Sequence, residues 1–316
     1  MTVPLALFGF ALTVAMVTPR LVGSAHWTWR SPRSGIIYWQ ASVFSVLASC
    51  VLLALTALLP VHRISFDVGH VLHACPEVLR RRYTFTEDSW LHLGSLLVAG
   101  GTVLSLLRAL VVRGLAVRRG RARQRLLLDL LVRQRDSHYG AHIVDHDIAL
   151  AYCVPGGGGR VVVTTAAVAA LDDRQLTAVL AHEHAHLDGR HDLVLFGADV
   201  AATAFPWSRF FRTSRRELAR LVEMLADDEA TRRSDRASLA SALVDLGQSA
   251  TPEGSVGATG DTVQRVERLV QNAPGLSRGR RGVVVATSLV LLTAPWVIAV
   301  APAWAARSGR CPHAGA

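Results

Sequence analysis

Residues 181–186 read A-H-E-H-A-H and contain the pattern H-E-x-x-H. On a helix, His182 and His186 are one turn apart and face the same side, so two imidazoles can bind one metal ion. Glu183 lies beside the first of them, where a carboxylate can take a proton from a metal-bound water. The pattern predicts a zinc site with Glu183 as the catalytic base. For an isolated match, the alternative is a histidine-rich surface helix, or one whose histidines satisfy core hydrogen bonds.

Two histidines are one short of the three protein ligands that a catalytic zinc site uses. Glu223 is the preferred third ligand, because Asp227 lies four residues further on and can orient a ligand histidine. Asp192 is the other candidate, since residues 182–192 have the metzincin spacing with Asp in the third ligand position. Metzincins also need a Met-containing turn, but Met224, the only methionine downstream, lies in the acidic helix. Taken alone, that acidic motif also fits a solvated helix face.

A further cation or imidazole is expected near the metal, where it can stabilise the oxyanion of the reaction. His191, Arg232 and Arg233 are the candidates for this role, and the sequence does not rank them. His184 is off the face that carries the two ligands, so it is expected to be structural.

The elements around the motif must hold it in place. Two short strands are predicted at residues 148–154 and 160–165, joined by a Pro and four Gly. The Gly run is not a phosphate loop, because no Gly-Lys-Ser/Thr follows it. A strand just ahead of the metal helix could offer its edge to an extended peptide. Asp172 or Asp173 can cap the metal helix, and Gly189 is expected near its end.

Long apolar runs dominate the rest of the chain. Hydrophobic residues make up 51% of the 316 residues, and the mean hydropathy is +0.31. Four runs are candidates for crossing a bilayer: residues 3–17, 36–59, 90–112 and 283–305. The first is short, and a cleaved signal peptide is its alternative. No basic residue precedes it and no clear cleavage site follows, so a retained helix is preferred.

The basic residues indicate how these spans are oriented. The net charge is +10 and no Lys occurs, so all 34 basic residues are Arg. They cluster beside the apolar runs, which favours contact with anionic lipid over direct nucleic-acid binding. A basic helix is expected at 120–135. Arg-rich flanks follow the third run and precede the fourth, so the segment between them is predicted to be cytoplasmic. Residues 80–82, which are all Arg, would then lie outside the cell, which disagrees with the positive-inside rule.

The predicted fold is therefore a mainly α membrane protein with an α+β zincin (gluzincin) protease domain. The expected parts are a membrane part at 1–112, a cytoplasmic protease domain at 113–282, a fourth transmembrane helix at 283–305 and an extracellular tail at 306–316. Cys75 and Cys311 would share the oxidising outer side. They are expected to form a disulfide, with two free thiols as the alternative.

Residues 181–192 are similar to the A-H-E-x-A-H-x-x-x-R-H-D segment of the BlaR/MecR family of antirepressor membrane metallopeptidases. The layout of three spans, a protease and a last span also resembles that family, whereas HtpX-type peptidases share the core and order their spans differently. The resemblance implies zinc ligation by His182, His186 and Glu223. It implies Glu183 as general base and acid, and Asp227 as the partner of a ligand histidine.

In function, this resemblance implies a relay that carries an outer signal across a bacterial cell membrane and leads to cleavage of a cytoplasmic repressor. The family's penicillin-binding sensor domain is missing after the last span, so direct acylation by a β-lactam is not expected. The prediction is a multi-pass zinc metalloendopeptidase with one zinc ion per chain. Its expected partners are a protein substrate such as a BlaI-like winged-helix repressor and membrane lipid, and a homodimer is left open. The alternatives are an HtpX-type quality-control protease and a non-catalytic zinc-containing signal transducer.

Overall fold

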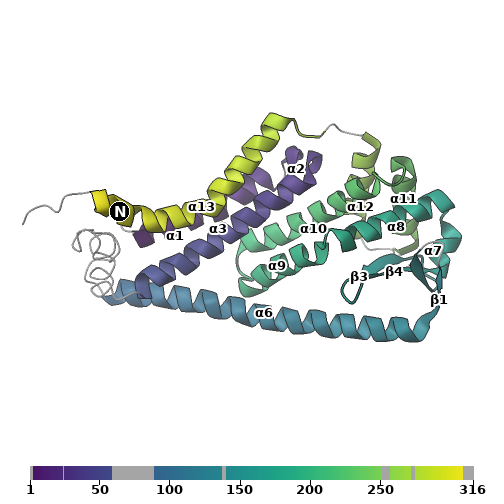
Figure 1. Ribbon diagram of the computed structural model, residues 1–316, viewed down its shortest axis with the longest axis horizontal. Helices are drawn as coiled ribbons and strands as arrows, with labels where there is room; N and C mark the ends of the chain where they lie inside the picture. The colour runs from purple at the N-terminus through teal and green to yellow at the C-terminus, as the bar shows by residue number, and fades with distance from the viewer. Residues whose placement is uncertain are drawn as a thin grey trace, which may run out of the picture.

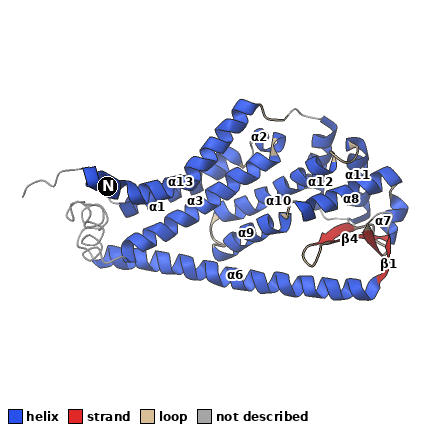
Figure 2. Cartoon of the chain, in the orientation of Figure 1, coloured by secondary structure: helices blue, strands red, loops and turns tan. Residues whose placement is uncertain are grey.

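The computed structural model describes residues 3–23, 25–58, 89–136, 140–250, 257–271 and 275–308. This part of the chain is mostly helical and includes one small sheet (Figures 1 and 2). The first elements are α1 (Val3–Val22), α2 (His26–Arg30), α3 (Pro32–Leu58), α6 (Ser89–Leu131), β1 (Val132–Asp136), β2 (Ala141–Val144), β3 (Ala151–Val154) and β4 (Arg160–Thr164). The helices α7 (Thr165–Ala170), α8 (Asp173–Asp188), α9 (His191–Ala204), α10 (Arg209–Ala230), α11 (Arg236–Ala250), α12 (Gly257–Gln271) and α13 (Arg278–Ser308) follow.

Four of the described helices are long and apolar enough to cross a membrane, namely α1, α3, α6 and α13. Each of the four predicted spans falls on one of these helices. The first extends to Val22 and so reaches the length that a bilayer requires. In Figure 1, α1, α3 and α13 lie toward one end of the molecule, the sheet, α8, α11 and α12 lie toward the other, and α6 runs along both.

The third of these helices differs from its prediction in where it ends. α6 runs without interruption from Ser89 to Leu131, 43 residues, and the chain then enters β1. The basic helix expected at 120–135 is therefore the continuation of the third span, and its last residues form a strand instead. The Leu, Ala and Arg residues after position 112 are strong helix formers, and no Pro interrupts them, so nothing local ends the helix at the membrane surface.

The helices that carry the motifs pack directly on the spans. α10 lies against α3, and residues from α1, α3, α9, α10 and α13 form one hydrophobic core. Trp39 of α3 is fully buried in it, with its ring centroid 6.3 Å from that of Phe210 of α10. The predicted membrane part and protease part thus share a core, because the apolar face of α10 is buried against a span.

The sheet has the strand order β1-β2-β4-β3, so β3 is an edge strand. The predicted hairpin is confirmed: β3 pairs antiparallel with β4, with Tyr152 opposite Val162. Residues 156–159 in its turn all have positive φ, a conformation that glycine adopts without steric cost. Val161 and Val163 of β4 pack in a core with α8, which fixes the sheet beside the metal helix.

Helix α8 begins and ends as its sequence predicts. The Asp172 side chain accepts hydrogen bonds from the backbone N–H groups of Arg174 and Gln175, and Gln175 completes a capping box. Gly189 ends the helix, and Arg190 adopts φ 47° in the left-handed region before α9 begins. α9 then packs between α6 and α10.

Three of the predictions fall outside the described residues. Neither Cys75 nor Cys311 is described, and the same holds for residues 80–82 and the tail from 309 onward. Among the described residues, Cys50 and Cys153 are free thiols.

Candidate metal centre and active site

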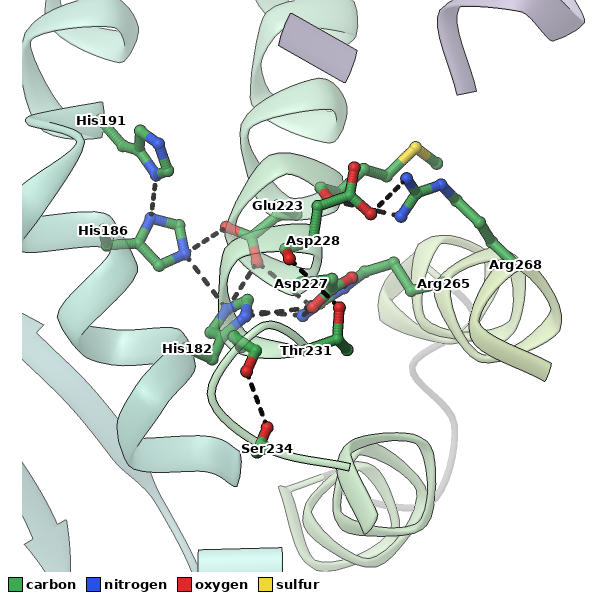
Figure 3. A network of polar contacts seen from close by, with 12 residues as sticks. His182, His186, His191, Glu223, Asp227, Asp228, Thr231, Ser234, Arg265 and Arg268 are labelled. Carbon is green, nitrogen blue, oxygen red and sulfur yellow. Dashed lines mark hydrogen bonds and ion pairs between the residues drawn. The ribbon is translucent and has the colours of Figure 1, made fainter. Parts of the chain in front are cut away.

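Helices α8 and α10 face each other and bring three predicted ligands together (Figure 3). Nε2 of His182 and Nε2 of His186 are 3.1 Å apart, and the Glu223 carboxylate oxygens lie 3.5 and 3.6 Å from them. Four ligands placed tetrahedrally at zinc bond lengths of about 2.0–2.1 Å are separated by roughly 3.3 Å. The donor set and its spacing therefore fit a zinc ion. In the described part of the chain, these residues form a group that could hold a metal.

Asp227 orients the first of these histidines. One of its carboxylate oxygens lies 3.0 Å from Nδ1 of His182, and its side chain is completely buried. This contact places Nδ1 against the carboxylate, so Nε2 is the ring nitrogen that faces the ligand cluster. Burial would raise the pKa of Asp227, but Arg265 and His182 lower it, so the group is ionised at neutral pH.

His191 contacts the second ligand histidine, His186, as Asp227 contacts the first. Its Nδ1 lies 3.2 Å from Nδ1 of His186 (Figure 3). Burial and the nearby imidazole of His186 lower the pKa of His191 to about 4, so its ring is neutral at pH 7. A neutral His191 can accept the Nδ1–H of His186, which leaves Nε2 of His186 free for a metal.

The proton on His182 gives zinc binding a defined pH dependence. Burial would lower the pKa of His182, but Asp227 and Glu223 raise it to about 9 in the metal-free protein. Below that pH zinc must displace a proton, so its apparent affinity should fall by about tenfold for each pH unit from pH 8.5 to 6.5. Chelator competition would measure this. Asp227→Asn should flatten the upper part of the profile, whereas a pH-independent affinity of the wild type would contradict the assignment.

Glu183 lies beside the ligand cluster and is mostly shielded from water. Burial raises its pKa above the ordinary value, while His182 and His186 act in the opposite direction. A carboxylate with a raised pKa takes up a proton more readily, which suits a group that accepts a proton and later returns it. Cys153 of the edge strand β3 lies against it. Burial and the Glu183 charge together raise the thiol pKa to about 12, so the thiol stays protonated and uncharged.

Arg265 of α12 is a site residue that the sequence analysis missed. Its Nε and Nη2 donate to the two oxygens of Asp227 at 2.9 and 2.7 Å, and its Nη1 lies 3.1 Å from Glu223. Its Nη2 is also 3.4 Å from Nε2 of His182. Arg265 thus supplies the positive charge for two carboxylates (Figure 3). Arg265 lies 38 residues after Asp227 in the chain, so no short-range sequence pattern links the two residues. The sequence offers one indication, which is that Asp227 and Asp228 on α10 are opposite in charge to Arg265 and Arg268 on α12.

Three other predicted residues lie away from this cluster. Asp192, the alternative ligand, pairs with Arg121 of α6 at 2.7 Å. Arg232 pairs with Glu229 and Arg233 with Asp188, and both arginine side chains are exposed. Among the described residues, Arg265 is the cation that contacts the cluster. His184 binds the Leu180 carbonyl through Nδ1 at 2.7 Å, as expected for a structural residue.

An H-E-x-x-H helix that faces a Glu-x-x-x-Asp helix, packed on helices that could cross a membrane, is an arrangement typical of a membrane-associated zinc metallopeptidase. Residues 120–207 match the family model described as peptidase family M48. The match spans the end of α6 through α9 and includes the H-E-x-x-H helix, but it stops before Glu223. This segment is therefore similar to peptidase family M48. None of the curated proteins and none of the solved structures matches the chain.

Proposed function

We propose that this protein is an integral-membrane zinc metalloendopeptidase that cleaves proteins at the cytoplasmic surface of the membrane. The observation that carries the proposal is the convergence of two imidazole Nε2 atoms and the Glu223 carboxylate, with Glu183 beside them. A bound zinc ion would supply Lewis-acid chemistry, lowering the pKa of water toward about 7 and polarising the scissile carbonyl.

The chain's own residues provide the proton transfers and the orientation. Glu183 accepts the proton of the attacking water and passes it to the leaving amine, a role that suits its raised pKa. Asp227 and His191 hold the two ligand histidines in the tautomer that leaves Nε2 free. The nearby positive charge of Arg265 favours the ionised form of Glu223 and Asp227.

The edge strand β3 is the proposed docking place for the substrate backbone. Within the described sheet it has β4 on one side only, and it packs against α8. Cys153 on this strand contacts Glu183, so a peptide paired along β3 would pass the catalytic base. Strand addition lets the main chain provide affinity, with side chains alternating between pockets and solvent.

The orientation rests on the distribution of arginines. Arginines occur near the end of α1 (Arg20), before and at the start of α3 (Arg30 and Arg33), in α6 (Arg113 to Arg125) and at the start of α13 (Arg278 to Arg281). α1, α2 and α3 contact α10, α6 contacts α9, and α13 follows α12 in the chain. The positive-inside rule therefore favours a cytoplasmic catalytic site.

We further propose a cytoplasmic repressor as the substrate, in a BlaR/MecR-like relay. The support is the R-H-D segment at residues 190–192, in which Arg190 makes the left-handed turn, His191 holds His186 and Asp192 is tied to α6. Quality control of membrane proteins is the second candidate, favoured by the packing of α10 directly on a span, which brings the site close to the bilayer.

Substrate breadth distinguishes the two candidates. Membrane and cytosolic proteomes of cells with wild-type protein and with Glu183→Gln would be compared after brief expression. A single stabilised DNA-binding repressor is expected for the relay, whereas many stabilised membrane proteins would support quality control. Chelation by 1,10-phenanthroline should reproduce the Glu183→Gln pattern. If neither treatment stabilises any protein, the peptidase proposal is wrong.

Arg265→Ala is expected to weaken zinc binding or hydrolysis by about 10–100-fold, the usual effect of losing a residue that holds a ligand's partner. The reason is that Asp227, completely buried, would lose its bidentate cation. Arg265→Lys keeps the charge and should recover part of the loss. Arg233→Ala, which removes an exposed arginine, serves as the control and should change neither zinc affinity nor rate. Equal effects of both alanine variants would contradict the role.

A further inference from the structure

A cavity of about 540 Å³ lies between α2, the C-terminal end of α10, α12 and the beginning of α13. Its lining is strongly cationic, with five arginines against two carboxylates, Asp228 and Glu267. The arginines are Arg30, Arg232, Arg236, Arg268 and Arg281. Such a lining favours an anionic ligand.

Two of these arginines are already neutralised and three are not. Arg268 pairs with Asp228 at 2.6 Å, and Arg232 pairs with Glu229 at 2.6 Å. Among the described residues, Arg30, Arg236 and Arg281 have no carboxylate at ion-pair distance. These three arginines come from α2, α11 and α13. Three separate helices therefore each contribute an arginine without a carboxylate partner to the lining of one cavity.

The cavity lies at the ends of candidate spans. α2 connects the candidate spans α1 and α3, and Arg281 is in the first turn of the candidate span α13. A second cavity of about 470 Å³ shares Arg30 and adds Trp27 and Arg280. Trp residues beside Arg residues at the ends of spans are typical of the membrane–water interface, where lipid phosphates lie.

We propose that this cavity binds a phosphate group, supplied by the headgroup of an anionic phospholipid or by a soluble phosphate ester. Arginine suits this ligand because its planar fork donates two parallel hydrogen bonds to phosphate oxygens. Basic pockets between membrane helices on the cytoplasmic side bind anionic lipid headgroups in this way.

The cavity is linked to the metal centre through α12. Arg268 in its wall donates to the Met224 carbonyl and to Asp228 of α10, and Arg265, one turn earlier on α12, holds Asp227 (Figure 3). A phosphate bound between α2, α11 and α13 would secure α12 against α10 and thereby stabilise the ligand arrangement. This coupling rests on the proposed peptidase function, whereas the binding itself does not.

The test uses the full-length protein in nanodiscs of phosphatidylcholine, with or without phosphatidylglycerol. Native mass spectrometry would measure retained lipid, and thermal unfolding would measure stabilisation. The test variant is the triple substitution Arg30→Gln, Arg236→Gln and Arg281→Gln. The control is Arg174→Gln, Arg190→Gln and Arg233→Gln, which removes the same charge from exposed positions outside the cavity and outside the Arg-rich flanks of the spans. Glycerophosphoglycerol, added to phosphatidylcholine nanodiscs, tests the soluble source.

We expect the wild type and the control to retain phosphatidylglycerol and to melt at a higher temperature with it. The test variant should bind at least tenfold more weakly and lose the shift in melting temperature. A shift with the soluble phosphodiester but no retained lipid would assign the site to soluble phosphates. Equal binding by all three proteins, or equal loss in both variants, would overturn the proposal. If lipid is retained but no hydrolysis is seen in any nanodisc, the peptidase proposal fails and the binding site stands.

Discussion

Glu183→Gln is expected to lower the rate of peptide hydrolysis by about 10²–10⁴-fold while leaving zinc bound, which is the usual contribution of a positioned general base. The amide has nearly the shape of the carboxylate but cannot accept a proton. Glu183 is not among the three grouped donors, so the metal site should persist in the variant. Its raised pKa means that an uncharged side chain at this position should also be tolerated by the fold.

The measurement is cleavage of an unfolded protein such as casein by detergent-solubilised enzyme, with zinc content determined on the same samples. Asp188→Asn is the matched control, because it makes the same acid-to-amide change at an exposed position on the same helix. It should keep the wild-type rate. If Glu183→Gln retains both zinc and a rate within a few-fold of wild type, Glu183 is not the base. If the wild type also fails to cleave, the non-catalytic transducer becomes the better description.

Glu223→Ala should abolish stoichiometric zinc binding and, with it, hydrolysis. The substitution removes one of the three side chains that would bind zinc. The affinity for zinc should therefore fall by more than the 10–100-fold expected when a residue that only holds a ligand in place is lost. Burial would raise the pKa of Glu223, but the two ligand histidines and Arg265 hold it well below its ordinary value. The carboxylate is therefore an ionised ligand at neutral pH.

The companion variant for this experiment is Asp192→Ala, which tests the alternative ligand. Asp192 pairs with Arg121 and both side chains are partly exposed, so its loss should cost no more than about 1 kcal/mol of stability and leave zinc in place. Zinc per chain, measured by mass spectrometry on purified samples, separates the two carboxylates. Loss of metal in Asp192→Ala with retention in Glu223→Ala would reverse the assignment.

Local periodicity explains why so much of the site could be predicted. In a helix, residues four apart lie on one face, so the pairing of His182 with His186, and of Glu223 with Asp227, follows from spacing alone. The helix cap at Asp172 and the Gly-rich turn after β3 depend on a few adjacent residues, and both were predicted. The spans were found by their apolar length, which a bilayer requires.

The misplaced boundary of α6 and the missed Arg265 have a common cause. Apolar length marks only the part of α6 that can lie in a membrane. The residues beyond it permit a helix, and α9 packs along this helix and supports its continuation. Arg265 reaches the centre only because α12 folds back over α10, a contact between residues far apart in the chain. No short-range pattern encodes such a contact.

The order of residues was therefore enough to determine the chemistry available to this protein: two imidazoles, a neighbouring base and an apolar body that requires a membrane. It favoured Glu223 over Asp192 as the third ligand, but it could not bring that carboxylate to the histidines or identify the cation beside them. This arrangement depends on how α8, α10 and α12 cross, because these crossings bring Glu223 and Arg265 to the histidines and direct Asp192 to α6 instead. Crossings are set by the packing of many side chains at once, and a ligand must lie within a few tenths of an ångström of its metal to bind it.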